Sequence, residues 1–555
     1  MLVNDKIWMA QGDLPCCLLL NQANRHGLIA GASGTGKTVT LKVMAEGFSE
    51  AGVPVFMADV KGDVTGMADA GTCTNFIRKR MDFFGIKEEE FRFTGVPVRI
   101  WDMLGDKGLP VRITISDMGP VLLSRLLGLT DVQEGVLNIV FRVADDQQML
   151  LIDLKDLRAM LNYVAEHSKD YETVYGRVSS ASVGAIQRAL ISVEDQGGDI
   201  FFGEPDLDLA DWFACAPDGR GYVNILNAAK LIQMPQIYSM FLLWMLSTLF
   251  DTLPEVGDPD KPRFVFFFDE AHLLFDDMPK SLTDKIVQVV KLIRSKGVGV
   301  YFITQSPSDI PDEVLAQLSN RVQHGLRAYT PAEMKSVKAA AASFRTNPKF
   351  DSVEALQDLG TGEGLVSFLD DEGRPSVVER AKVLFPACNM NAASDELMEE
   401  VYLEQSNLML KYGDAVDRES AFEMIIEQNE ADAEAERIVA ERAAFEAERA
   451  AFEAERAKEE ERRRREAEKA EAARQRQLER EAEAERRRIE REIAAAERKR
   501  EQEAARQARE AEKRAEQKRK ARNRAATEAV GTLLSPVFGK TTGRKIARGI
   551  FGNLR

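Results

Sequence analysis

Between residues 23 and about 385, short and nearly continuous apolar runs alternate with longer stretches whose apolar residues recur at helical spacing. Such apolar runs are typical of strands that are buried on both faces of a parallel sheet, and the longer stretches are typical of covering helices. The alternation therefore predicts an α/β domain with a mostly parallel central sheet. The expected strands are Gly27–Ala30, Val53–Val60, Val98–Trp101, Val111–Ser116, Tyr222–Leu226, Arg263–Asp269, Gly299–Thr304, Val322–Tyr329 and Gly364–Leu369.

Two stretches depart from this alternation. From Pro120 to about Phe213 the pattern is helical, with leucines spaced to cover one helix face, and it predicts a helical insertion at about 120–213. The apolar run Met240–Phe250 is well short of the roughly 20 residues that span a bilayer, so it predicts a buried helix and no membrane span.

The segment 431–526 consists almost entirely of Glu, Arg, Ala, Lys and Gln, without Gly or Pro. It predicts a helix of roughly 140 Å at about 1.5 Å per residue. Phe445 and Phe452 lie one heptad apart, but few other apolar residues continue a seam, which favours a solitary charged rod over a coiled coil. A partly disordered charged linker is the alternative that the same composition allows.

The remaining residues 527–555 regain Gly, Pro and apolar residues and are basic. They predict a tail that docks on the acidic body of the same or a neighbouring subunit, in preference to a membrane or nucleic acid. The chain is thus expected to divide into a catalytic domain at 1–430, a rod at 431–526 and a tail at 527–555.

The net charge of −16 is unevenly distributed along the 555 residues. Residues 431–555 hold 34 basic and 27 acidic groups, which leaves the first 430 residues near −23. An acidic domain argues against non-specific DNA binding, although a basic lining inside a ring remains an alternative. Five scattered cysteines and a polar start at Met1–Lys6 lead us to expect a cytoplasmic protein.

The clearest motif is Gly31-Ala32-Ser33-Gly34-Thr35-Gly36-Lys37-Thr38, which follows an expected strand and precedes a helical pattern. This context is typical of a phosphate-binding P-loop, in which backbone N–H groups and a helix N-terminus surround an anion. Lys37 is expected to reach the β- and γ-phosphates, and the Thr38 hydroxyl is expected to bind Mg²⁺. The cofactors predicted are ATP and Mg²⁺.

A second motif lies at the end of the expected strand Arg263–Asp269, where two carboxylates follow each other. We expect Asp269 to hold the metal and Glu270 to orient and deprotonate the attacking water. His272, two residues further on, has no Cys or His partner at zinc-binding spacing and is predicted to be a packing residue.

Ligands of open parallel sheets lie at the carboxyl ends of the strands. Gln305 ends the strand Gly299–Thr304 and is therefore predicted to sense the γ-phosphate, with a polar strand cap as the alternative. Asp59 and Lys61 follow another strand at the same edge and are weaker candidates to border the nucleotide.

Multimeric nucleotide hydrolases often complete the site with an arginine from a neighbouring subunit. Arg294, just before the strand that carries Gln305, is our first candidate, and Arg321 and Arg327 follow it. Each of these alone is more typical of a surface or ion-paired arginine.

Taken together, these motifs resemble the HerA-like ATPases, in particular their bacterial branch. The resemblance covers roughly residues 10–425 and is carried by Arg25–Gly31, Asp59–Asp63, Phe201–Pro205, Phe267–Leu274, Leu292–Gly299, Thr304–Gln305 and Gln317–His324. It implies a RecA-type core, in which the strand carrying Gln305 lies between the P-loop strand and the Asp269 strand. It also implies a hexameric ring related to FtsK-type motors.

The chain departs from that family at both ends. Archaeal HerA proteins carry a β-barrel ahead of the ATPase and work with a nuclease, whereas about two dozen residues precede the P-loop strand here. Two functional hypotheses follow. The first is a Mg²⁺-dependent, ring-forming ATPase motor that translocates DNA, and the second is a nucleotide-gated scaffold whose rod recruits a protein partner.

Overall fold

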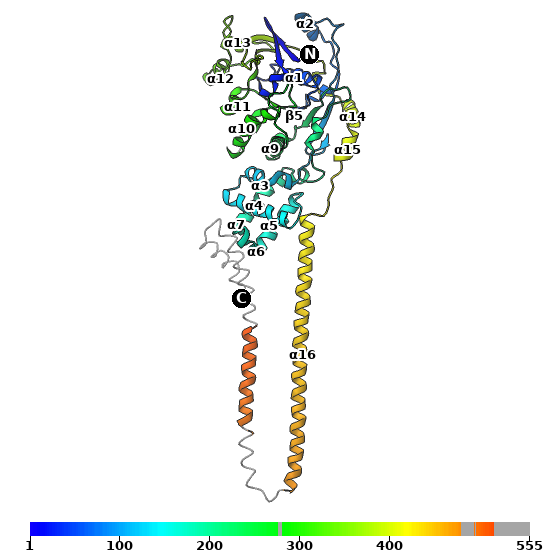
Figure 1. Cartoon of the computed structure of the whole chain (residues 1–555), viewed down its shortest axis with the longest axis vertical. Coiled ribbons are helices and arrows are strands. Elements are labelled where there is room, and N and C mark those ends of the chain that lie inside the picture. The colour runs from blue at the N-terminus through cyan, green and yellow to red at the C-terminus, as the bar shows by residue number, and fades with distance from the viewer. Residues whose placement is uncertain (276–279, 479–492, 494, 515–555) are drawn as a thin grey trace. The chain divides into compact units, whose positions relative to one another are not determined.

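The computed structural model describes residues 1–275, 280–478, 493 and 495–514 (Figure 1). Its described residues divide into two compact units: one comprises 1–158 and 185–418, and the other comprises 159–184 with the described residues after 418. The first unit contains the sheet. The strands are β1 Leu2–Val3, β2 Lys6–Gln11, β3 Pro15–Leu19, β4 Gly27–Ala30, β5 Val55–Asp59, β6 Val98–Asp102, β7 Leu109–Pro110, β8 Val223–Asn227, β9 Phe264–Phe268, β10 Val298–Thr304, β11 Asn320–His324, β12 Glu363–Ser367 and β13 Glu379–Val383.

The helices precede, follow or connect these strands. They are α1 Lys37–Glu50, α2 Asn75–Phe84, α3 Ile115–Leu126, α4 Asp131–Asp146, α5 Leu154–Glu166, α6 Ser168–Tyr175, α7 Ser180–Glu194, α8 Gly198–Phe201, α9 Pro235–Thr252, α10 Lys280–Ile293, α11 Asp312–Leu315, α12 Pro331–Ala342, α13 Ser352–Asp358, α14 Asp395–Glu404, α15 Ser406–Tyr412 and α16 Ala421–Leu478.

The sheet has the order β1-β2-β13-β12-β11-β4-β10-β9-β5-β8-β6-β7, and β3 pairs with β2. From β11 to β7 all neighbouring strands are parallel, whereas the pairs from β11–β12 through β2–β3 are antiparallel. The predicted α/β class with a mostly parallel sheet is therefore confirmed. Strand β10 lies between β4 and β9, as the resemblance implied.

Alternating side chains of the central strands pack into two layers. On one face, the α1 residue Phe48 contacts Phe267 and Tyr301, with ring centroids 6.2 and 5.9 Å apart. On the other face, Phe56 contacts Phe266 and the α9 residue Phe241. Because β9 is buried on both sides, it reads as a continuous apolar run rather than an alternating one.

Two of the expected strands are wrong in part. Val111–Ser116 is not a strand, because Thr114 accepts a hydrogen bond from the Asp117 N–H and caps α3, which begins at Ile115. The strand expected at Val322–Tyr329 runs instead from Asn320 to His324. At Gly325 the chain turns, and its carbonyl accepts a hydrogen bond from Ala32 N–H.

The helical stretches follow the sequence pattern more closely. Helices α3 to α8 occupy 115–201, within and just before the predicted insertion. The apolar run Met240–Phe250 lies in α9, in which every residue from Ile237 to Ser247 is buried. Among the residues that the structure describes, no helix is both long and apolar enough to cross a membrane.

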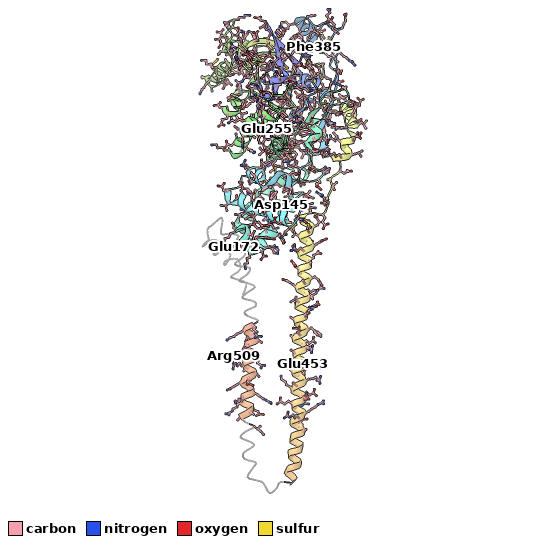
Figure 2. All side chains as sticks on the ribbon, in the orientation of Figure 1. Asp145, Glu172, Glu255, Phe385, Glu453 and Arg509 are labelled. Carbon is pink, nitrogen blue, oxygen red and sulfur yellow. The ribbon has the colours of Figure 1, made fainter. Side chains whose placement is uncertain are left out.

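The charged helix α16 begins at Ala421, ten residues before the predicted start of the rod, and residues 495–514 are also helical. The side chains of α16 from 427 to 460 are exposed, and Glu453 projects outward in Figure 2. Phe445 and Phe452 are exposed, and ion pairs between successive turns, such as Arg449–Glu453 at 3.0 Å, support the helix. The remainder of 431–526 and the predicted basic tail at 527–555 lie outside the described residues.

Candidate nucleotide site

The P-loop connects β4 to α1 and is held in place by three neighbouring strands. The N–H of Gly31 donates to Thr304 O at the end of β10 (3.2 Å), and the N–H of Ala32 donates to Gly325 O after β11 (3.0 Å). Thr35 O in turn accepts from the N–H of Gly362, just before β12 (2.8 Å). The loop is therefore fixed by backbone contacts that come from three distant parts of the sequence.

Glycines are required at defined positions of this loop. Gly34 and Gly36 have φ angles of 75° and 112°, in a region that residues with a Cβ rarely adopt. At Gly31, an added Cβ would lie 2.5 Å from the Cβ of His324. The sequence motif thus corresponds to a backbone shape that only glycine allows.

The first turn of α1 faces this loop. Its first N–H groups have no partner within the helix, and Gly36 at the N-cap has no side chain to accept from them. The Lys37 ammonium is buried and donates to Gly31 O (2.6 Å) and Ala32 O (3.1 Å). Burial lowers the pKa of Lys37, and the charge of Lys61 lowers it further, against the effect of Glu270 and Asp269.

Strand β9 delivers the acidic pair to the same edge of the sheet. Burial raises the pKa of Asp269 to about 6. Glu270 has a φ of 47°, and its N–H donates to Asp269 Oδ1 (2.9 Å). Burial by itself raises the pKa of Glu270, but the hydrogen bond and charge of Lys61 outweigh it, so that this pKa lies below its usual value. The structure thus brings Lys37, Asp269 and Glu270 together.

These residues fit a Mg²⁺–nucleotide complex. Glu270 Oε2 and Asp63 Oδ1 are buried and accept no hydrogen bond from the described residues, so both oxygens remain available. No group of three or more His, Cys, Asp or Glu among the described residues could hold a metal by itself. A nucleotide-bound Mg²⁺ takes one or two protein oxygens and completes its shell with phosphate and water.

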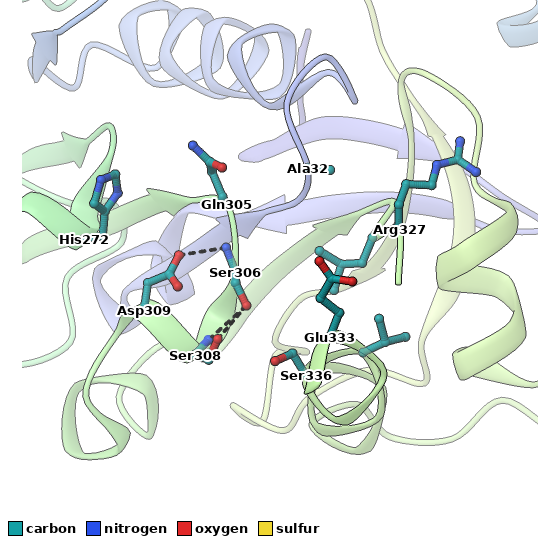
Figure 3. A pocket seen from close by; sticks show the side chains of 11 residues that line it. Ala32, His272, Gln305, Ser306, Ser308, Asp309, Arg327, Glu333 and Ser336 are labelled. Atoms are coloured by element: carbon teal, nitrogen blue, oxygen red, sulfur yellow. Dashed lines mark hydrogen bonds between the residues drawn. The ribbon is translucent and has the colours of Figure 1, made fainter. Parts of the chain in front are cut away.

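A pocket of about 470 Å³ borders the P-loop at Ala32, next to the carboxyl ends of β10 and β11. Gln305 and His272 line it on the β10 side, and Arg327 and Glu333 line it on the α12 side (Figure 3). Gln305 is exposed, and it lines this pocket together with the P-loop residue Ala32. His272 Nδ1 lies 3.4 Å from Glu270 Oε2.

The arginine candidates are scattered. Arg294 lies before β10, at the sheet edge opposite the P-loop, and forms an ion pair with Asp258 (2.8 Å). Arg321 donates to Leu318 O and Leu315 O within its own chain. Arg327 is exposed at the pocket. None of the three contacts Lys37 or Glu270 within the described chain, whereas the role predicted for Arg294 concerns a neighbouring subunit.

Sequence reasoning missed one residue and undervalued another. His324, at the end of β11, bridges Thr40 Oγ1 and Glu363 O (2.8 Å each) and packs beneath Gly31. Its burial lowers the pKa to about 4, so the ring is neutral. Lys61 donates to Glu270 Oε1 at 2.7 Å. For both His324 and Lys61, the sequence offered one signal: a polar residue at or just after the carboxyl end of a central strand.

Three features define a P-loop ATPase with a RecA-type core. A P-loop connects β4 to α1, an acidic pair follows β9, and β10 lies between β4 and β9. Comparison with known proteins agrees with this class. Residues 5–494 match the family described as Helicase HerA-like C-terminal, and the chain belongs to that family.

Two relatives are DNA double-strand break repair helicases HerA. The protein from Sulfurisphaera tokodaii is 26% identical over 149 residues, which are 26% of this chain and 29% of the relative. The protein from Sulfolobus acidocaldarius is 19% identical over 369 residues, 62% of this chain and 63% of the relative. This chain therefore spans less than two thirds of either relative. Among solved structures, the bacterial conjugative coupling protein TrwB is 14% identical, with a TM-score of 0.44 over 69% of this chain and 92% of TrwB.

Proposed function

We propose that this chain is a cytoplasmic, Mg²⁺-dependent ATPase whose P-loop, Gly31 to Thr38, surrounds the phosphates. In this proposal Lys37 binds the β- and γ-phosphates, and Thr38 and Asp269 hold Mg²⁺, which would neutralise phosphate charge. Glu270 accepts the proton of the attacking water. Gln305 senses the γ-phosphate from the end of β10.

One observation carries this proposal. Lys37, Asp269 and Glu270 lie close together at one edge of the sheet, beside the backbone N–H groups at the start of α1. The test is ATP hydrolysis by the full chain with and without Mg²⁺. Lys37→Ala is expected to lose nucleotide binding, whereas Glu270→Gln is expected to bind nucleotide and turn it over at least ~100-fold more slowly. Glu399→Gln, an exposed change on α14, serves as the control. Wild-type turnover by both site variants would refute the proposal.

We further propose that the chain assembles as a hexameric ring in which Arg294 acts on the site of a neighbour. The resemblance to HerA-like ATPases supports the ring, and the position of Arg294 away from its own P-loop supports an action between subunits. A mixing experiment tests this. Arg294→Ala and Glu270→Gln subunits, each inactive alone, are expected to regain activity when mixed, because some interfaces then pair an intact Arg294 with an intact Glu270. Absence of recovery in mixed rings of confirmed mass would contradict the role of Arg294.

The polymer on which such a motor acts is proposed to be DNA. The support is the function named for the two HerA relatives, which are DNA repair helicases. Double-stranded DNA is expected to stimulate ATP turnover, with a steep decrease as salt rises, because bound phosphates release counterions.

The second candidate is a nucleotide-gated scaffold, and the exposed charged helix α16 favours it, since a surface of that length can recruit a protein partner. ATP turnover that is indifferent to DNA would support the scaffold and contradict the motor. In both cases we propose the divisions 1–430 for the ATPase, 431–526 for the rod and 527–555 for a docking tail.

A further inference from the structure

Lys61 forms a direct ion pair with the residue proposed above as the general base. Its ammonium donates to Glu270 Oε1 at 2.7 Å. The Lys61 side chain is 46% exposed, whereas that of Glu270 is 10% exposed. The buried carboxylate is therefore held by a lysine that reaches it from the solvent side.

The backbone turn that carries Lys61 is held by several hydrogen bonds. The turn after β5 is closed by the Asp59 carboxylate, which accepts from the N–H of Gly62 (2.6 Å) and of Val64 (3.2 Å). The buried Lys42 ammonium of α1 holds the next part of the turn through Asp63 O (2.7 Å). The side chain of Lys61 thus extends from a turn that is held by hydrogen bonds, and this turn directs its ammonium toward Glu270.

The two oxygens of Glu270 have different surroundings. Oε1 accepts from Lys61, while Oε2 is buried and accepts no hydrogen bond from the described residues, with His272 Nδ1 3.4 Å away. A buried carboxylate oxygen without a donor is costly, and it is retained where a ligand or water supplies the donor. Glu270 also occupies the left-handed backbone region, with φ 47°, which further fixes the direction of its side chain.

We propose that Lys61 is a positioning residue, which fixes Glu270 through Oε1 so that Oε2 is the oxygen that meets the attacking water. This inference rests on the proposed ATPase function. Oε2 takes the proton of the water as the water oxygen bonds to the γ-phosphorus and the bond from that phosphorus to the ADP oxygen breaks. The proton then passes from Oε2 to solvent.

Two other roles for Lys61 predict different results. A lysine that binds phosphate directly contributes to nucleotide affinity, so that its removal weakens binding. A lysine that restrains Glu270 in an inactive position lowers turnover, so that its removal raises turnover. A positioning residue affects the chemical step with little effect on affinity.

The test uses the full chain and two measurements, the dissociation constant of a fluorescent ATP analogue and the kcat of ATP hydrolysis. For Lys61→Met we expect kcat to fall ~10- to 100-fold, with the dissociation constant within ~3-fold of wild type. Lys61→Arg is expected to recover part of kcat, because a guanidinium can also donate to Oε1. Lys338→Met, an exposed lysine change on α12, is the matched control, and urea midpoints check that all variants fold.

A double-mutant comparison isolates the connection to Glu270. Because Lys61 acts through Glu270, adding Lys61→Met to Glu270→Gln should lower kcat no further. An unchanged or raised kcat in Lys61→Met, a tenfold loss of affinity, or full additivity in the double variant would overturn the inference. If Glu270→Gln itself turned over normally, the proposed role of Glu270 would fail instead, so the two failures are distinguishable.

Discussion

At the scale of single residues, the site depends on a few close contacts. Gly31 lies against His324, which bonds Thr40 on the P-loop helix. The proximity of Lys37, Asp269 and Glu270 could be predicted from sequence, because each belongs to a short motif at the carboxyl end of a predicted strand. The contacts of His324 with Thr40 and of Lys61 with Glu270 could not be predicted, since the partners lie 284 and 209 residues away along the chain.

Gly31→Ala is expected to disturb this arrangement. The new Cβ would stand 2.5 Å from the Cβ of His324, and one of the two must move. We expect a loss of about 1–3 kcal/mol in the free energy of unfolding and at least tenfold weaker nucleotide binding. Urea titration and a fluorescent nucleotide measure the two effects. Gly135→Ala on α4, where a Cβ meets nothing within 4 Å, should leave nucleotide binding unchanged and should not lower the free energy of unfolding.

Glu46, buried on α1, gives a pH prediction. Its carboxylate accepts from the N–H groups of Ala387 and Cys388 (2.9 and 2.6 Å), and burial raises its pKa from 4.5 to about 7. Folding therefore favours the protonated form, whose stabilising contribution is complete below pH 4.5 and is lost as the pH rises through 7.

The variant Glu46→Gln cannot ionise at this position. Its free energy of unfolding relative to wild type should therefore rise by about 2–3 kcal/mol between pH 4.5 and 7.5, as urea titrations at several pH values would show. A difference that does not change with pH would contradict the raised pKa.

At the scale of elements, α1 joins the P-loop to the chain that follows β13. Lys37 begins the helix at the site, and the Lys42 ammonium, fully buried, donates to the carbonyls of Asp63, Asn389 and Met390 at 2.7–3.1 Å. The helix thus fixes both the turn of Lys61 and the segment after β13.

Lys42→Met is expected to destabilise the protein by about 1–3 kcal/mol, because three partly buried carbonyl oxygens lose their donor while the side-chain volume is kept. The decrease should appear as a lower urea midpoint, and Lys79→Met at an exposed position of α2 should show none. Equal stability of the two variants would show that water replaces the ammonium.

The sequence pattern predicted the central strands well because those buried on both faces are continuous apolar runs. It missed the short strand β7 and, in the antiparallel extension of the sheet, the strands β1, β2, β3 and β13. β13 is a strand because it pairs with β12 and β2, although its residues Glu379–Val383 mix charged and apolar side chains. Pairing between distant segments has no local signature of this kind.

At the scale of the whole molecule, the charged helix α16 differs from the catalytic core in the exposure of its side chains. Ala421 and Ile425 are buried, whereas all side chains from 427 to 460 are exposed. The side chains from 427 to 460 therefore contribute nothing to an apolar core.

The chain 1–430 is expected to fold and to keep basal ATP hydrolysis within about twofold of the full chain if the protein is a motor, because no proposed site residue is removed. Light scattering and ATP turnover of the truncated chain measure this. Loss of its oligomer would contradict the motor hypothesis and support the scaffold.

The location of Arg294 and the P-loop at opposite edges of one sheet has a consequence for symmetry. If Arg294 acts on the site of a neighbour, as proposed, a twofold dimer completes its two sites only when each P-loop edge lies beside the Arg294 edge of its mate. A head-to-tail contact also joins unlike edges, but in an open row the last site always lacks a donor. In a head-to-tail assembly every site is completed only when the row closes on itself, so closure of the row should mark the onset of full activity.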